Sequence, residues 1–131
     1  MNWEVYMGHE IATKKLSMLN YVESGTKKEL YSHVLFDEAI CFEFNAPRDV
    51  LVVTDKKIIA IDVQGLTGKK KEVLVIPFSK ITAFSTETAG TFDFDLEVKI
   101  WASGIGLVEF TFLKGVKNFT ELTKHLAKHI V

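Results

Sequence analysis

Basic side chains are concentrated at two predicted turns of the chain. One turn is followed by three consecutive lysines, and the other holds two lysines between apolar runs. Ammonium groups clustered on one exposed face would attract an anionic headgroup, because each lysine near an anionic surface contributes about 1 kcal/mol. The alternative is a pair of solvated turns whose charges discourage pairing with other strands. The candidate anion or lipid contacts are Lys56, Lys57, Lys69, Lys70 and Lys71.

A second candidate is the small, polar segment formed by Glu87, Thr88, Ala89 and Gly90, at a predicted bend between strands. Gly90 can adopt a positive φ at such a bend without the steric cost that other residues meet. The segment is interpreted either as a recognition loop or as a turn whose residues serve only the turn geometry.

Carboxylates recur at every second position in Asp93, Asp95 and Glu97, so they share one face of a predicted strand. With further oxygen ligands they could bind a divalent cation, and in a pocket one of them could act as a general acid or base. The regular alternation equally predicts a solvated outer face, or a polar subunit interface paired with lysines.

Two histidines, His125 and His129, lie four residues apart on a predicted helix and could reach one metal ion. No third ligand and no HExxH pattern accompanies them. Both lie near the helix C-terminus, where a cationic side chain is favourable without any metal. We therefore expect no metal site and no cofactor.

The single cysteine, Cys41, excludes an intrachain disulfide and a four-cysteine zinc site, and it indicates a reducing compartment. It lies in an apolar predicted strand, where burial would raise the pKa of the thiol and make it unreactive. No nucleophile and base can be paired from the sequence, so we expect no catalytic residues and no enzymatic activity.

The chain has 131 residues, of which 47% are hydrophobic and 25% charged, with a formal net charge of −1. This length fits one domain, and the apolar fraction excludes a disordered chain. The neutral balance argues against a nucleic-acid partner. No secretory signal and no apolar run of about 18 residues is present, which predicts a cytoplasmic protein.

Residues 1–35 are predicted to form an N-terminal helical extension. Apolar residues between Ile11 and Val22 fall on one helical face, and Thr26 with Glu29 has the spacing of a capping box that begins a second short helix. These apolar faces are expected to pack on the sheet of the same chain or on a neighbouring subunit, because large exposed apolar patches are uncommon.

Residues 36–131 are predicted to form a mainly β, α+β domain with a C-terminal helix from Phe119 to Ile130. Alternating or short apolar runs predict seven strands, too few for two separate cores, and therefore a bent sheet or partly open barrel that the helix covers. The predicted strands lie at 40–45, 50–54, 58–61, 73–78, 82–86, 92–100 and 108–112.

Several segments of this part resemble the bacterial pleckstrin-homology domain family. They are Asp49–Thr54, Gln64–Lys70, Ile76–Phe78 and the run from Phe84 through Glu87–Gly90 to Trp101, and the resemblance covers about residues 38–131. It implies a seven-stranded domain with a C-terminal helix, ring-shaped homo-oligomers that are expected to be pentamers, and no established enzymatic activity.

The sequence and the resemblance together predict a non-enzymatic, ring-forming scaffold or protein-binding module with a protein partner. Repetition of one surface around a ring would strengthen individually weak contacts. The alternative function is a peripheral domain that binds anionic lipid through its lysine-rich turns, so contact with a membrane surface stays open.

Overall fold

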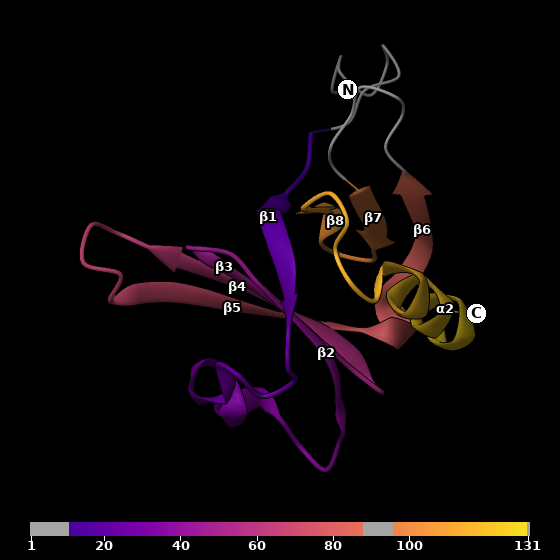
Figure 1. Cartoon of the computed structure of the whole chain (residues 1–131). Coiled ribbons are helices and arrows are strands. Elements are labelled where there is room, and N and C mark those ends of the chain that lie inside the picture. Colours follow the sequence, from indigo (N-terminus) through magenta and orange to yellow (C-terminus); the bar gives the residue numbers. More distant parts are fainter. Residues whose placement is uncertain (1–10, 88–95, 131) are drawn as a thin grey trace.

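The computed structural model describes residues 11–87 and 96–130, which form one eight-stranded sheet, three short 3-10 helices and a C-terminal α-helix (Figure 1). The strands are β1 (Lys14–Val22), β2 (Ile40–Asn45), β3 (Asp49–Thr54), β4 (Lys57–Gln64), β5 (Lys70–Pro77), β6 (Ile81–Glu87), β7 (Leu96–Ala102) and β8 (Gly106–Phe112). The helices are η1 (Lys28–Leu30), η2 (Ser32–Val34), η3 (Phe78–Lys80) and α2 (Phe119–His129). Each of the seven predicted runs overlaps a strand, although residues 92–95 of the run at 92–100 lie outside the described residues, and the C-terminal helix is confirmed.

The eighth strand, β1, lies where the sequence predicts the first helix, so the predicted helical extension is wrong for residues 14–22. Leu16 and Leu19 are both fully buried although they are three residues apart. A bulge lies between them, with Met18 at φ 62°, and its extra residue keeps both leucines on the core side. A three-residue spacing of buried leucines imitates helical periodicity, which explains the wrong prediction.

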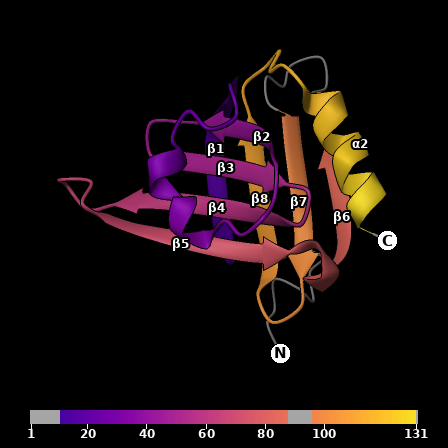
Figure 2. The same cartoon turned by 90° about the horizontal axis from the view of Figure 1, so that it is seen from below.

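Strand β1 joins the two halves of the sheet. The strand order is β5-β4-β3-β2-β1-β8-β7-β6, and β1 is antiparallel to β2 but parallel to β8. Strands β2–β5 and strands β6–β8 cross at a wide angle, as Figures 1 and 2 show. The sheet is therefore strongly bent and open, and its two ends are β5 and β6.

The main hydrophobic core lies between the two halves of the sheet and α2. Its largest fully buried members include Phe44 of β2 and Phe110 and Phe112 of β8. Leu122 and Leu126 of α2 belong to the same buried cluster, so the helix contributes its apolar stripe to this core as predicted. Burial of these side chains by elements from both halves stabilises the bend.

A smaller core lies on the opposite face of β3 and β4, beneath the segment between β1 and β2, which we call the β1–β2 segment (residues 23–39; Figure 2). Tyr31 from this segment is fully buried against Val50, Val52, Ile59 and Ile61. The second predicted helix is reduced to the 3-10 turns η1 and η2, neither of which has a side-chain cap.

The predicted capping box does not form. The Thr26 hydroxyl donates to the backbone carbonyl of Glu23 at 2.5 Å, so it satisfies a turn and caps no helix. The segment is instead held in place by side chains of the sheet, as described below.

Candidate functional site

The hairpin of β4 and β5 projects away from the body of the protein (Figures 1 and 2). Its turn runs from Gly65 to Gly68, which have φ angles of 80° and 70°. Glycine adopts such angles without steric cost, so the sequence specifies this turn locally. Leu66 stands at the turn with its side chain completely exposed, at a relative exposure of 101%.

Three predicted contact residues, Lys69, Lys70 and Lys71, follow this turn and are all exposed. Lys70 pairs in register with Gln64, and Lys71 pairs with Val63, so these two lysines lie at the beginning of β5. Successive residues of a strand point to opposite faces, which distributes the lysines over both faces of the hairpin.

Asp62 and Glu72 are the carboxylates closest to the three lysines along β4 and β5, and both contact Lys14. The Lys14 ammonium lies 3.2 Å from Asp62 and 2.6 Å from Glu72, which pair with each other across β4 and β5. Among residues 11–87 and 96–130, no ion pair within 4.0 Å joins Lys69, Lys70 or Lys71 to a carboxylate. The end of the hairpin is therefore an unneutralised basic tip.

Arg48, on the turn between β2 and β3, adds a fourth positive charge at this end of the sheet. Its Nη1 donates to the backbone carbonyl of Gly65 at 2.8 Å and to that of Val63 at 3.4 Å. We call Arg48, Leu66, Lys69, Lys70 and Lys71 the basic tip. The contact of Arg48 to the turn is not identifiable from the sequence, because residues 48 and 65 come together only through pairing of β3 with β4.

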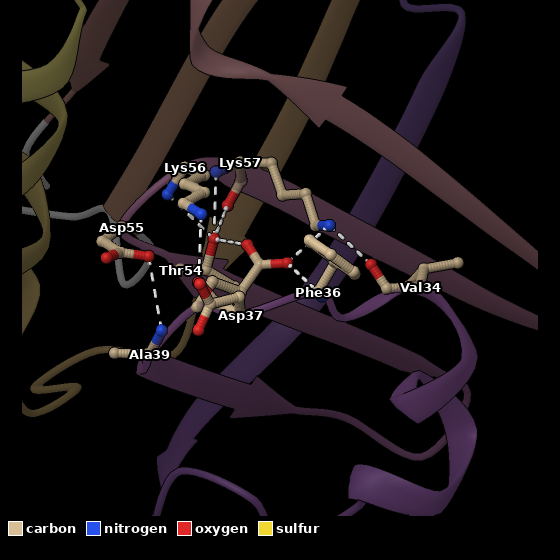
Figure 3. Close-up of polar contacts among 9 residues, drawn as sticks. Val34, Phe36, Asp37, Ala39, Thr54, Asp55, Lys56 and Lys57 are labelled. Carbon is tan, nitrogen blue, oxygen red and sulfur yellow. Dashed lines mark hydrogen bonds and ion pairs between the residues drawn. The ribbon is translucent and has the colours of Figure 1, made fainter.

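The two other predicted contact residues, Lys56 and Lys57, lie at the opposite end of β4. Eight residues of strand span about 23 Å between their ends, so the structure does not bring the two lysine groups together. Lys57 Nζ lies 2.6 Å from Glu38 Oε1 and donates to the Val34 carbonyl at 2.5 Å, while Lys56 Nζ donates to the Asp37 carbonyl at 3.0 Å (Figure 3). Both ammonium groups thus hold the β1–β2 segment.

Glu38 and Thr54 complete this network. The Thr54 hydroxyl donates to Glu38 Oε2 at 2.6 Å and accepts from the backbone N–H groups of Lys56 and Lys57, each at 3.0 Å (Figure 3). Burial alone would raise the pKa of Glu38, but hydrogen bonds from Lys57 and Thr54 hold that pKa below its usual range. The network fastens the β1–β2 segment to the turn between β3 and β4.

Glu43 fastens the other end of the β1–β2 segment. The alternation of residues 40–45 predicts that Glu43 lies on an outer strand face, but in the structure its side chain is fully buried. Its Oε1 accepts from the Tyr31 hydroxyl at 2.6 Å and from the Gly25 N–H at 3.1 Å, and its Oε2 accepts from the Lys27 N–H at 3.0 Å. Burial and the neighbouring carboxylate raise the pKa of Tyr31. These contacts stabilise the fold and leave no oxygen of Glu43 free for chemistry.

The two histidines of α2 pack against aromatic rings. Their ring centroids are 4.4 Å apart, His129 stacks on Phe78 at 5.1 Å, and His125 Nε2 lies 2.8 Å from the Thr54 carbonyl oxygen. Burial, and then the charge of His125, lower the pKa of His129. In the described ranges, 11–87 and 96–130, no three His, Cys, Asp or Glu residues lie close enough together to hold a metal ion.

The remaining candidates are only partly described. Thr88, Ala89, Gly90, Asp93 and Asp95 lie outside the described residues. Glu87 is exposed at the end of β6, in register with Glu97 of β7. Glu97 lies 3.6 Å from the Lys99 ammonium, and burial raises the pKa of its carboxyl.

The thiol of Cys41 is half-buried, and burial raises its pKa, as the sequence predicts. A hollow of about 440 Å³ lies between the end of β1 and the segment that leads to α2. It is lined by Asn20, Tyr21, Val22, Glu23, Gly115 and Lys117, so no predicted contact residue contributes to it.

The bent open sheet with one C-terminal helix defines a pleckstrin-homology-like protein. The fold is similar to the crystal structure of a DUF1696 family protein with a pleckstrin-homology domain from Shewanella loihica PV-4, with a TM-score of 0.75, 32% identity, and coverage of 88% of this chain and 100% of that chain. A pleckstrin homology domain from Shewanella amazonensis SB2B gives a TM-score of 0.63 and 36% identity over 82% of this chain and 98% of that one.

The family model of the bacterial PH domain matches residues 11–130, and the chain belongs to this family. A relative from Bacillus subtilis (strain 168), the uncharacterized protein YjqA, is 48% identical over 81 residues, which are 61% of this chain and 65% of that protein. A PH domain containing bacterial protein from Exiguobacterium sibiricum 255-15 shares the fold, with a TM-score of 0.68 and 22% identity over 86% of this chain and 62% of that chain. No helix within the described residues is both long enough and apolar enough to cross a membrane.

Proposed function

We propose that this chain is a non-catalytic binding module whose subunits assemble into a ring and present one repeated surface to a protein partner. The polar clusters around Glu38 and Glu43 support the non-catalytic part, since both carboxylates are engaged in holding the β1–β2 segment. The free thiol of Cys41 suits a reducing compartment such as the cytoplasm.

The observation that carries the assembly is the pair of open sheet ends. Among the described strands, β5 pairs with β4 alone and β6 pairs with β7 alone. An unpaired strand edge is a template for another chain, and two different edges on one subunit can make the head-to-tail contact that a ring requires. Half-exposed Val73 and Val75 on β5 and exposed Ala83 on β6 supply apolar surface for such a contact.

Charged substitutions at the two edges test the assembly. We expect Val75→Lys in β5 and Ala83→Lys in β6 each to reduce the mass measured by sedimentation velocity, because a charge buried at the contact between subunits is unpaired. Thr120→Lys, an exposed change on α2, is the matched control and should leave the mass unchanged. An assembly that survives both edge variants at the wild-type concentration contradicts the proposed contact.

A second function, contact with an anionic membrane surface, is favoured by the three unneutralised lysines of the basic tip. Sedimentation of the full chain with vesicles of phosphatidylcholine, with and without phosphatidylglycerol, tests it. Preferential pelleting with the anionic vesicles supports this function, and equal pelleting with both kinds of vesicle rejects it.

A further inference from the structure

We propose that the last turn of α2 opens when it takes up protons: His125 stays bound to the turn between β3 and β4, while His129 leaves its place on Phe78. We call residues 127–130 the latch. Its opening uncovers Phe78 and the neighbouring Phe42, so that an apolar surface appears in acid and is covered at neutral pH. This inference is independent of the assembly and of the lipid contact proposed above.

His125 is the fixed point of this arrangement. Its Nε2 lies 2.8 Å from the backbone carbonyl oxygen of the fully buried Thr54. Because a carbonyl oxygen only accepts, Nε2 carries a hydrogen and donates it, whether or not Nδ1 is also protonated. The ring also packs edge-on against Phe42 and Phe78, with centroids 5.5 Å and 5.9 Å away. A proton on Nδ1 therefore strengthens the bond to Thr54, since the donor then belongs to a cation.

His129, one turn later, is held differently. Its ring stacks on Phe78, with the centroids 5.1 Å apart and the two planes 14° from parallel. Within the part of the chain that the structure describes, no hydrogen bond holds this ring. His129 is also the last residue of α2, where the Ile130 N–H donates to the Leu126 carbonyl at 2.8 Å. A helix end that is held mainly by ring contacts opens at a low cost in free energy.

The charges around His129 come from α2 and from the elements packed against it. The rings of His125 and His129 are 4.4 Å apart between centroids, so two protons place two positive charges side by side. Lys128 adds a further cation, and Asp55, on the turn between β3 and β4, opposes them. Other ionisable side chains of β2, η3, α2 and this turn are the thiol of Cys41, exposed Lys80 and Lys124, and Lys56 and Lys57, which hold the β1–β2 segment.

The sum of these interactions disfavours a proton on His129. Burial, then the charge of His125 and then that of Lys128 lower the pKa of His129 below 6.5 in the closed helix, whereas opening of the last turn returns the ring to water. The open form therefore takes up the proton first, and the closed form loses stability as the pH falls below 6.5. The negative end of the helix dipole favours one cation here, so a proton on His125 is tolerated and the second proton opens the latch.

The opening is confined to one turn. Leu122 and Leu126 are fully buried in the main core and hold the rest of α2 in either state. Phe78 is buried and loses the ring that stacks on it, and Ile130 is half-buried at the edge of the same core. The surface uncovered in acid is therefore formed by side chains of β2, η3 and the end of α2.

Amide hydrogen exchange of the full chain at about pH 7.5 and about pH 5.5, corrected for the intrinsic effect of pH on exchange, tests the latch. One proton taken up on opening raises the opening constant by at most about tenfold for each pH unit below the pKa of the open form. We therefore expect residues 127–130 to lose roughly threefold to tenfold in protection at the lower pH. Residues 119–124 should keep their protection, and the fluorescence of the apolar dye ANS should rise.

Substitutions at His129 separate charge from packing. His129→Phe retains the stacking on Phe78 but takes up no proton, so its protection at residues 127–130 should not depend on pH. His129→Lys carries a charge at both pH values and should exchange at neutral pH as the wild type does in acid, whereas the uncharged His129→Met should stay more protected than His129→Lys. His33→Phe, at an exposed position on η2, is the matched control and should retain the response of the wild type.

Three results would overturn the latch. The first is equal protection of residues 127–130 in the wild type at the two pH values. The second is the same loss of protection in the wild type and in His129→Phe, which assigns the opening to other groups. The third is a loss of protection along the whole of α2, which indicates global unfolding in acid and not a local opening.

Discussion

The Arg48 guanidinium donates a 2.8 Å hydrogen bond to the backbone carbonyl of Gly65, which ties the turn between β2 and β3 to the end of the β4–β5 hairpin. A projecting hairpin is ordinarily held only by its own ladder. Here a side chain from the adjacent turn fixes the tip that carries Leu66 and three lysines. The hydrogen bond from Arg48 therefore holds in place the turn that presents the basic tip, which is the surface of the proposed membrane contact.

Substitutions at Arg48 should distinguish two effects of this side chain, which are its attachment of the turn and its positive charge. Arg48→Gln is expected to speed amide hydrogen exchange at residues 65–68 and to weaken binding to anionic vesicles by about fivefold, because it removes one cation. Arg48→Lys keeps the charge but loses the forked geometry of the guanidinium, so it should speed exchange and retain vesicle binding. Unchanged exchange in both variants would show that Arg48 does not hold the turn.

Strain at Met18 provides a test of the bulge that defines β1. A non-glycine residue at φ 62° carries a steric cost, and the Met18 side chain is 61% exposed, so little packing is lost on its removal. Met18→Gly should raise the free energy of unfolding by about 0.5–1 kcal/mol in urea titrations. Ser17→Gly, one residue earlier, should lower it by about the same amount. A loss of stability in Met18→Gly would contradict the positive φ.

The buried pair of Tyr31 and Glu43 should contribute measurably to stability. Tyr31→Phe leaves Glu43 Oε1 without its 2.6 Å partner in a fully buried position, and we expect a loss of about 1–3 kcal/mol in urea unfolding. Tyr21→Phe is the control, because the Tyr21 ring packs edge-on against Phe44 and its packing is retained. If Tyr31→Phe and Tyr21→Phe are equally stable, the hydrogen bond between Tyr31 and Glu43 does not anchor the β1–β2 segment.

Glu38 should make stability depend on acid pH. Its pKa is held below the ordinary 4.5, so its contribution is present above that pH and is lost as the pH falls through the lower, folded-state pKa. Glu38→Gln should cost about 2–3 kcal/mol near neutral pH, and the difference from the wild type should narrow below about pH 4.5. Exposed Glu87→Gln should change stability by less than about 0.5 kcal/mol at either pH.

His129 should produce a second, separate dependence on pH. Its pKa is lowered below the ordinary 6.5 in the folded protein, so the unfolded chain takes up the proton first and the free energy of unfolding falls as the pH drops below 6.5. Of the charged groups near it, His125 and Lys128 lower this pKa and Asp55 raises it. His129→Phe keeps the stacking on Phe78 and should flatten this part of the profile. If the free energy of unfolding of His129→Phe depends on pH as that of the wild type does, groups other than His129 cause the dependence.

The sequence was sufficient for the elements whose periodicity is regular. All seven predicted runs overlap strands within the described residues, and α2 was recognisable because Leu122 and Leu126 repeat at helical spacing. Strand β1 was not predictable, because its bulge changes the spacing of Leu16 and Leu19 from two residues to three. The spacing of apolar residues along the sequence does not distinguish a strand with such a bulge from a helix.

The candidate contacts were predictable as residue types but not as a cluster. Lys56 and Lys57 lie close to the other lysines in sequence, yet strand β4 separates the two groups, and Glu38 comes from a distant segment to pair with Lys57. Glu43 has the alternation of an outward-facing residue and is buried because the β1–β2 segment covers it. The alternation of residues along one strand does not predict which distant segment will cover it or which side chain will pair with it.

Native mass spectrometry of the full chain at micromolar concentration tests the proposed assembly most directly. The chain has a mass of 14.8 kDa, so a pentameric ring closed by head-to-tail contacts predicts a species of about 74 kDa. A strictly monomeric spectrum, with all of the protein at 14.8 kDa, would contradict the assembly.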